Sequence, residues 1–287
     1  MTATGFSETC DSKVRRGRPK GITTARRERM TAIVEIVEAN HPCTIRNVLY
    51  QAMVAGIAGK NDYSKIQRDL VELRRSGEVP FDRIVDNVRW RRQVQTHDGL
   101  ESALTETASM YRRNLWADAS ETVEVWCESD SIAGVLWPTC HEWAVPLLPM
   151  RGFASITFAH SSAEELNAQG RPAYVYYVGD LDPHGVSIED NLRKALDDWC
   201  TVPWTLHRIG VTAEQAEELD LPGTKPRRPF GFDREVQAEA VPPRHQRQLL
   251  DVALAGHVDH HQLSVLRAAE ESERDFLWSL ADGEVWR

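Results

Sequence analysis

Apolar residues in the first part of the chain recur at the spacing of an α-helix. Met30, Ile33, Ile36 and Val37 predict a helix between residues 25 and 40. The next stretch, TIRNVLYQAMVAG, predicts a second helix. Its N-cap is Thr44, because a threonine side chain can accept a hydrogen bond from the first free N–H groups, and a glycine ends it at residue 56.

The stretch YSKIQRDLVELRRSG predicts a third helix with one apolar and one basic face. Ile66, Leu70 and Leu73 are expected to face inward. The residues expected to face outward are basic and are the candidate DNA-binding residues of this helix: Lys65, Arg68, Arg74 and Arg75. EVPFDRIVDNVRW follows and predicts a short strand or wing. Residues 26–95 therefore match the plan of a winged helix-turn-helix, with a plain helical bundle as the alternative.

Beyond a helical connector at residues 96–118, the pattern changes to short, continuously apolar segments that alternate with helical ones. Strands are predicted at residues 122–127, 145–150, 173–178 and 204–210, and helices at 129–143, 161–170 and 186–199. Ser162 and Glu165 have the spacing of a capping box for the helix at 161–170. This alternation predicts an α/β fold whose mostly parallel, Rossmann-like sheet is covered on both faces. The domain spans residues 119–287 and ends in a helical extension.

Composition is that of an ordinary globular protein, with 41% hydrophobic and 27% charged residues among 287. No apolar run approaches the ~20 residues that cross a bilayer, and no signal peptide is evident, so we expect no membrane association. The five cysteines form no CxxC pair. This usage favours a cytoplasmic protein with structural thiols.

Charge is unevenly distributed along the chain. Residues 1–118 contain 20 basic and 15 acidic residues, whereas the remainder contains 14 basic and 28 acidic ones. Residues 1–25 are polar and are expected to form a disordered basic arm. Within it, Arg16-Gly17-Arg18-Pro19 matches the core of an AT-hook, whose arginines enter the minor groove of A·T-rich DNA; the alternative is a basic tail that binds phosphates without preference. The asymmetry predicts a part that contacts nucleic acid, joined to a part with a different task. We expect double-stranded DNA as the partner and association with the nucleoid.

Three acidic residues follow two of the predicted strands directly. Glu128 comes after the strand at 122–127, and Asp180 and Asp182 come after the strand at 173–178. Because parallel strands end at one edge of a sheet, these carboxylates are expected to lie together. An all-oxygen group of this kind suits Mg²⁺, with Mn²⁺ as a possible substitute. The alternative is that Asp182 only caps the helix predicted from Val186.

These residues carry a resemblance to one branch of Toprim domains, that of the topoisomerase VI A subunit and the related meiotic double-strand-break protein. The branch motif D-x-D-P-x-G-x-x-I is matched by Asp180, Asp182, Pro183, Gly185 and Ile188. RGFASIT supplies Gly152, Phe153 and Thr157, in keeping with a branch element that contains a glycine, an aromatic residue and a threonine. The sequence departs from the branch at three positions, which carry Ser129, Phe158 and Gln237 in place of a usual lysine, arginine and acid.

The resemblance also implies a nucleophilic tyrosine in the second helix of a preceding winged helix. Tyr50 and Arg46 stand at the matching places, one helical turn apart. Tyr63 is a second candidate. The alternative for Tyr50 is that its ring packs against Ile45 and Leu49 as ordinary core. The segment VQAEAVPPRH resembles the closing segment of short bacterial relatives and implies Glu239 as an additional site acid.

By this resemblance the chain is expected to be an enzyme of the type IIB topoisomerase kind. It would form a homodimer and cleave DNA by Mg²⁺-dependent transesterification, with Glu128 sharing the metal or moving a proton. No phosphate-binding loop of the GxxxxGK[ST] type is present, so a separate ATPase subunit is a possible partner. Two alternatives remain: a Toprim nuclease that hydrolyses DNA with a metal-bound water, and a DNA-binding protein with a degenerate site.

Overall fold

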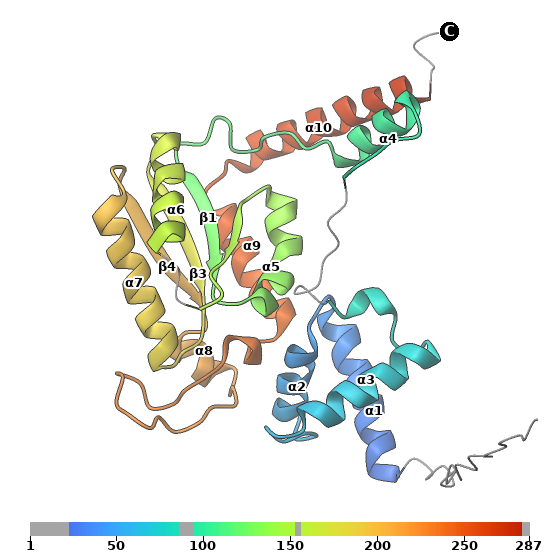
Figure 1. Cartoon of the computed structure of the whole chain (residues 1–287), viewed down its shortest axis with the longest axis vertical. Coiled ribbons are helices and arrows are strands. Elements are labelled where there is room, and N and C mark those ends of the chain that lie inside the picture. Colours follow the sequence, from blue (N-terminus) through green and yellow to red (C-terminus); the bar gives the residue numbers. More distant parts are fainter. Residues whose placement is uncertain (1–22, 86–93, 153–155, 283–287) are drawn as a thin grey trace, which may run out of the picture.

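The computed structural model of the chain describes residues 23–85, 94–152 and 156–282 (Figure 1). It contains a unit of three helices followed by an α/β unit with a four-stranded parallel sheet. No helix among the described residues is long and apolar enough to cross a membrane.

The helical unit consists of α1 (Thr24–Asn40), α2 (Ile45–Val54) and α3 (Tyr63–Ser76). Thr44 is the N-cap of α2, as predicted, and forms a reciprocal capping box with Asn47. Gly77 ends α3 in the left-handed region at φ 84°, a conformation that glycine adopts at little cost.

The core of the helical unit is closed by the apolar face of α3. Ile66, Leu70 and Leu73 are buried against residues of α1 and α2, which confirms their predicted inward orientation. Asp69 is buried on the same helix and accepts hydrogen bonds from Arg26 at 2.8 Å and Arg29 at 2.7 Å. Because a buried carboxylate needs such partners, Asp69 fixes α3 against the start of α1.

The predicted wing is described only in part. A 3₁₀ turn, η1, covers Phe81–Arg83, and Ile84 then forms a single parallel bridge with Cys43. Most of the remaining wing, residues 86–93, lies outside the described residues, and so do the basic arm and its candidates Arg16 and Arg18. The three helices are observed, and the wing stays a prediction.

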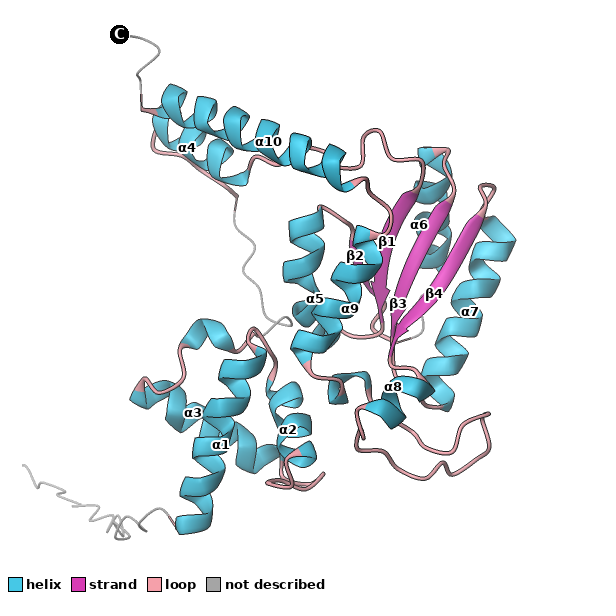
Figure 2. Cartoon of the chain, turned by 180° about the vertical axis from the view of Figure 1, so that it is seen from behind, coloured by secondary structure: helices cyan, strands magenta, loops and turns pink. Residues whose placement is uncertain are grey.

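The sheet contains β1 (Thr122–Cys127), β2 (Leu147–Pro149), β3 (Ala173–Val178) and β4 (Trp204–Gly210), in the order β2-β1-β3-β4. All neighbouring strands are parallel, which confirms the predicted α/β class. Helices α5 (Asp130–Trp143) and α9 (Pro243–Ala255) cover one face. Helices α6 (Ile156–Gln169) and α7 (Pro183–Trp199) cover the other (Figure 2).

Burial on both faces explains why the central strands β1 and β3 are mainly apolar, with Glu124 as the charged exception in β1. On the face of α5 and α9, Val125 and Cys127 join a core with Leu136 and Leu250. On the opposite face, Trp126 and Tyr177 join a second core with Leu166, Ile188 and Leu192. A strand between two helical layers has no polar face, so alternation is lost.

Two predictions about the helices were wrong in detail. Helix α6 begins at Ile156, before the predicted residue 161, and Ser162 lies inside it, where its hydroxyl donates to the Phe158 carbonyl at 3.0 Å. Ser162 is therefore no N-cap; the serine-to-glutamate spacing also occurs within helices. In the connector, only α4 (Leu100–Met110) is helical. It lies beside α10 (His260–Ala281), and this pair projects from the α/β unit in both views (Figures 1 and 2).

Polar contacts join the helical unit to the α/β unit. The guanidinium of Arg247, on α9, donates to the carbonyls of Asn40, His41 and Pro42 at 3.1, 3.0 and 3.2 Å. Gln51 donates to the Ala240 carbonyl at 3.0 Å. The C-terminal end of α1 has carbonyls without helical partners, so a cation there satisfies them.

We expect Arg247→Ala to loosen this junction. Loss of hydrogen bonds to three carbonyls should lower the free energy of unfolding by about 1–3 kcal/mol. Arg247→Lys should recover only part of this, because one ammonium group cannot reach three carbonyls. Thermal unfolding and amide hydrogen exchange at the end of α1 measure the effect. Arg244→Ala, exposed on the same helix, is the control and should change neither; equal effects of the two substitutions would contradict the assignment.

Candidate functional site

The sheet order places the ends of β1 and β3 at a topological switch point. β1 and β3 are neighbours, and the chain leaves them through helices on opposite faces of the sheet, α5 after β1 and α7 after β3. Crevices open at the carboxyl ends of such strands and are the usual sites of α/β folds. Cys127 pairs with Val178, and the Glu128 N–H donates to the Val178 carbonyl at 2.9 Å. The residues that follow the two strands are therefore adjacent.

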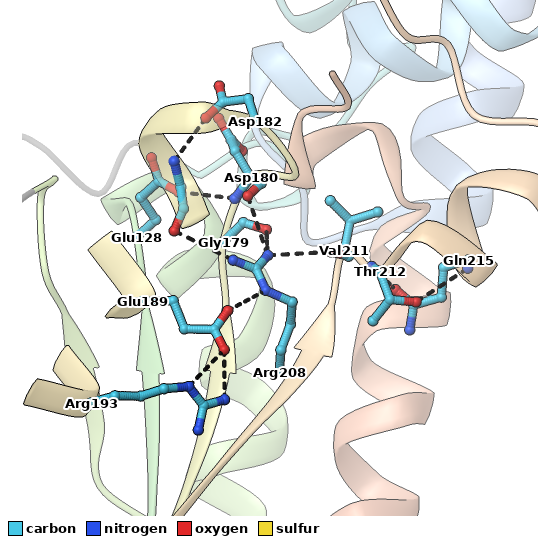
Figure 3. A network of polar contacts seen from close by, with 11 residues as sticks. Glu128, Gly179, Asp180, Asp182, Glu189, Arg193, Arg208, Val211, Thr212 and Gln215 are labelled. Carbon is cyan, nitrogen blue, oxygen red and sulfur yellow. Dashed lines mark hydrogen bonds and ion pairs between the residues drawn. The ribbon is translucent and has the colours of Figure 1, made fainter. Parts of the chain in front are cut away.

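Glu128 and Asp180 meet at this point. The Glu128 carboxylate accepts the backbone N–H of Asp180 at 2.8 Å (Figure 3). Asp180 in turn accepts the N–H of Ala238, the first residue of the 3₁₀ turn η2 (Ala238–Ala240), at 2.8 Å. The next residue, Glu239, is buried and pairs with the Arg46 guanidinium of α2 at 3.3 Å. The loop between β3 and α7, residues 179–182, carries both aspartates and is called the aspartate loop here. The structure thus gathers Glu128, the aspartate loop, Glu239 and Arg46.

The carboxylates perturb one another. Burial and, after it, the nearby charges of Glu128, Glu239 and Asp182 together raise the pKa of Asp180 to about 8. Burial also raises the pKa of Glu128, although the Asp180 N–H opposes this shift. Asp180 therefore retains a proton at neutral pH, and a cation placed beside it would offset both its burial and its repulsion from the neighbouring carboxylates.

Asp182 is the N-cap of α7, as the structural alternative predicted. One of its oxygens accepts the N–H groups of His184 at 2.9 Å and Gly185 at 2.7 Å, and Pro183 occupies the first helical turn. In the described chain, these bonds use only one of the two carboxylate oxygens. Capping therefore orients the side chain and leaves an oxygen available at the edge of the sheet.

Gly185 is required by the close approach of α7 to the aspartate loop. A Cβ atom at this position would lie 2.2 Å from the Asp180 carbonyl oxygen, which belongs to the backbone and cannot swing aside. The glycine of the D-x-D-P-x-G motif therefore lets the helix begin directly against the residue that carries the first aspartate.

We expect Gly185→Ala to displace this loop. Relief of the overlap should destabilise the fold by about 2–4 kcal/mol and lower the melting temperature by about 5–10 °C. Far-UV circular dichroism and thermal unfolding measure the change. Ser187→Ala, on the same helix, is the matched control. A Gly185→Ala variant as stable as the wild type would show that the close approach is not needed.

The donor set suits Mg²⁺ in its chemistry. Glu128, Asp180 and Asp182 offer oxygen ligands, and each has an oxygen that the hydrogen bonds above do not use. Within the described ranges, no three histidine, cysteine or acidic side chains lie in an arrangement that could hold a metal ion by themselves. Mg²⁺ commonly takes one or two carboxylates and completes its shell with water and substrate phosphates. These residues therefore fit an open, substrate-dependent magnesium site.

Arg208, on β4, stabilises the aspartate loop through hydrogen bonds to its backbone carbonyls. Its guanidinium donates to the carbonyls of Gly179 at 2.9 Å, Asp180 at 3.2 Å and Val211 at 3.2 Å, and to Glu189 at 2.6 Å (Figure 3). Glu189 is also bound by Arg193, and its pKa is lowered because these two arginines outweigh its burial. The role of Arg208 could not be predicted from the sequence, because only the three-dimensional fold brings its guanidinium to the carbonyls of two separate loops.

Tyr50 is half-buried and faces the α/β unit. Its ring packs against the core that contains α5 and α9, rather than only against its own helical unit. Burial and, after it, the charge of Glu239 raise the pKa of Tyr50 to about 12, although Arg46 opposes the shift. Asp180 of the same chain also contributes, so the phenol lies within electrostatic range of the acidic cluster. Tyr63 begins α3, is 41% exposed and has no described contact with this cluster.

The candidate DNA-binding residues of α3 differ in their surroundings. Lys65, Arg68 and Arg75 are exposed, and Lys65 forms a surface ion pair with Asp62 at 2.7 Å. Arg74 instead donates to the Phe81 carbonyl at 3.3 Å and lies over the Phe81 ring at 4.4 Å. Arg74 therefore holds η1 against α3, and the other three face solvent.

Three residues differ from those usual in the Toprim branch, and the structure shows where each of them lies. Ser129 is the N-cap of α5 and accepts the Ile132 N–H at 3.3 Å. Phe158 packs with the core between the sheet and α6. Gln237 precedes η2. Arg151, which follows β2 and pairs with Asp130 at 3.0 Å, is a cation at the same edge of the sheet, and its position after a strand is a signal that sequence reasoning missed.

Comparisons of the chain with models of protein families, with curated proteins and with solved structures find no match.

Proposed function

We propose that the chain is a DNA-cleaving enzyme that combines a winged helix with a Toprim domain and resembles the topoisomerase VI A subunit. One observation carries the proposal. The acids that follow β1 and β3 meet at the switch point of the sheet, and the helix with Tyr50 reaches the same cluster through the pair of Arg46 and Glu239. Acids at a strand end with a tyrosine and an arginine nearby suit phosphoryl transfer.

The proposed reaction is a transesterification. The phenolic oxygen of Tyr50 bonds to the phosphorus of a DNA phosphodiester, and the bond from phosphorus to the 3′ oxygen breaks. The phenol loses its proton and the leaving 3′ oxygen gains one. The product is a phosphotyrosyl bond, which retains the energy needed to rejoin the strand.

Each residue has a role in this scheme. Arg46 binds the phosphate, because a guanidinium pairs well with its oxygens. Asp180 and Asp182 hold Mg²⁺, which when bound stabilises negative charge that develops on the phosphate. Glu128 shares this site, and because burial raises its pKa above that of an ordinary glutamate, it is also the candidate to carry a proton. Glu239 positions Arg46.

The proposed enzyme would have DNA and protein partners and a defined location in the cell. Double-stranded DNA would contact α3 through Lys65, Arg68 and Arg75, and the basic arm through Arg16 and Arg18. A homodimer would allow staggered cuts in both strands, and topoisomerase activity would need a separate ATPase subunit. Such a protein would work in the cytoplasm at the nucleoid.

Trapping of a covalent intermediate tests the proposal. Supercoiled plasmid is incubated with the full chain and Mg²⁺ or Mn²⁺, and the reaction is stopped with a denaturing detergent. We expect nicked or linear DNA that enters a gel only after protease treatment, because the protein stays attached. Free cut ends without attached protein would contradict transesterification and favour the hydrolytic nuclease. DNA binding without metal-dependent cutting would favour the degenerate-site alternative.

A further inference from the structure

A basic loop projects from the acidic α/β unit beside the candidate site. The segment between α8 (Ala213–Glu218) and η2 extends away from the body of the molecule below α8 (Figure 1). Its outer part, residues 223–234, is called the basic loop here. It contains Lys225, Arg227, Arg228 and Arg234 against a single acid, Asp233, although the half of the chain from residue 119 has twice as many acidic as basic residues.

The three outermost cations are free to meet a ligand. Lys225, Arg227 and Arg228 are exposed, and no hydrogen bond or ion pair holds them within the described chain. Arg234 differs, because its guanidinium turns back toward the carbonyls of Ala216 and Leu221 at 3.5 Å. The loop thus keeps one arginine for its own support and presents the others to solvent.

The base of the loop is attached to the aspartate loop of the candidate site. Leu181, between the two aspartates, exchanges both backbone hydrogen bonds with Val236, at 2.8 and 2.9 Å. Thr224 and Glu235 form a second antiparallel bridge, at 2.9 and 2.7 Å. The basic loop is therefore fixed in register with Asp180 and Asp182, and its position relative to them does not depend on a flexible tether.

The same loop faces the helix that carries Tyr50. Pro222, Gly223 and Thr224 line a hollow together with Tyr50 and Lys60 of the helical unit. A phosphodiester that reaches Tyr50 from outside would therefore pass between an exposed lysine of the helical unit and the base of the basic loop. Lys60 lines one side of this hollow, and on the other side the exposed Lys225 directly follows Thr224 in sequence, while Glu235 is the one acid among the described residues of the lining. Positive charge next to the hollow favours a polyanionic strand.

The loop also has a rigid, aromatic tip. Pro226 and Pro229 within the loop, and Pro222 just before it, restrict its backbone, which lowers the entropy lost when it binds. Phe230 and Phe232 lie edge to face with centroids 5.4 Å apart, and Phe232 is 40% exposed. Exposed phenylalanine among arginines is typical of surfaces on which unpaired bases stack.

We propose that the basic loop is a DNA-binding loop of the α/β unit. Lys225, Arg227 and Arg228 bind backbone phosphates next to the scissile position, and Phe232 stacks on a base that is unpaired or unstacked there. The proposal rests on the proposed function for its substrate class. It adds a DNA contact on the acid-bearing half of the chain and a preference for DNA with single-stranded character.

Equilibrium binding tests the loop without any cleavage. Fluorescence anisotropy is measured for the full chain with a labelled duplex and with the same duplex carrying a single-stranded overhang, in EDTA and at several salt concentrations. Replacement of Lys225, Arg227 and Arg228 with alanine should weaken binding about tenfold or more at 0.1 M salt. It should also reduce the slope of log K against log salt by about 2–3, close to one per lost phosphate contact.

Single substitutions separate charge from folding. Arg227→Glu should weaken binding several-fold, whereas Lys194→Glu should have little effect. Lys194 is exposed on α7, 11 residues from Pro183, and therefore about 16 Å along the helix from the candidate site. Phe232→Ala should weaken binding to the overhang more than to the blunt duplex. Unchanged melting temperatures verify that these exposed residues do not alter the fold.

The outcomes distinguish this inference from the proposed function. Wild-type affinity and salt slope in the triple variant would overturn the loop assignment, even if Tyr50 forms its adduct. Loop-dependent binding without a tyrosyl adduct would support the loop and overturn the cleavage mechanism. Unchanged DNA binding together with an altered sedimentation coefficient would show that the loop contacts protein instead, and would also overturn the proposal.

Discussion

Tyr50→Phe is expected to abolish the covalent adduct between the chain and DNA. Phenylalanine keeps the ring that packs against the core of the α/β unit and removes only the oxygen that attacks phosphorus. The fold should therefore survive, and cleavage should fall by at least about 1,000-fold, since no other group supplies this oxygen. Gel mobility with and without protease measures the adduct, and the melting temperature verifies the fold.

Tyr63→Phe is the matched control for this substitution. Tyr63 is an exposed tyrosine of the same helical unit, at the start of α3, so its replacement should leave the adduct at the wild-type level. Metal-dependent cutting that persists in Tyr50→Phe would show that Tyr50 is structural. An adduct lost only in Tyr63→Phe would move the nucleophile to that residue.

A mixture of two inactive variants tests whether the site is shared between protomers. The family resemblance implies that Tyr50 of one protomer works with the acids of its partner, whereas the structure already brings Tyr50 into electrostatic range of Asp180 in its own chain. In a shared arrangement, a dimer of Tyr50→Phe with Asp180→Ala regains one intact site and should nick DNA. If each chain completes its own site, the mixture stays inactive.

Sequence patterns were sufficient to predict the sheet and the meeting of its acids. Continuous apolar strands that alternate with helices can only be buried on both sides, and parallel strands bring their carboxyl ends to one edge. The predicted neighbours Glu128 and Asp180 are consequently joined by a hydrogen bond. The motif glycine could likewise be noted from sequence, but its cause, the 2.2 Å approach to the Asp180 carbonyl, needed the structure.

Contacts between distant segments could not be predicted in this way. Arg208 donates hydrogen bonds to carbonyls of two loops, and Arg247 of α9 donates to carbonyls at the end of α1. Only tertiary packing brings these arginines close to their partners. Local periodicity contains no information about such partners. The basic loop was missed for a different reason: it has no periodicity, and its significance depends on its attachment to the aspartate loop through Leu181 and Val236.

Asp180→Asn is expected to make the protein more stable at alkaline pH and to abolish cleavage. The pKa of Asp180 is about 8 in the folded chain, against 3.8 for an ordinary aspartate. Between these values the folded state binds a proton that the unfolded state has lost, so stability falls as pH rises. Below about pH 4 both states are protonated and the effect is absent; above about pH 8 it is complete.

Asparagine cannot ionise and retains an oxygen that accepts the Ala238 N–H. The Asp180→Asn variant therefore does not lose stability in this way as the pH rises. The charges that face Asp180 are Glu128 after β1, Glu239 of η2 and Asp182 of its own loop, with Arg46 as a nearby cation. Each pKa unit corresponds to about 1.4 kcal/mol. Because the Asp180 side chain is partly exposed, solvent screening reduces the energy that this pKa difference would give. We therefore expect Asp180→Asn to raise the free energy of unfolding by about 2–4 kcal/mol at pH 8.5.

Melting temperatures of the two proteins at pH 5 and pH 8.5 measure this difference. The advantage of Asp180→Asn should be several degrees larger at pH 8.5, because pH effects of other groups cancel in the comparison. Mg²⁺ should raise the melting temperature of the wild type at pH 8.5 and have little effect on the variant, because ionised Asp180 then has its cation. A difference independent of both pH and Mg²⁺ would mean that Asp180 is ionised and unperturbed in the fold, and that the acids at the ends of β1 and β3 are not a cation site.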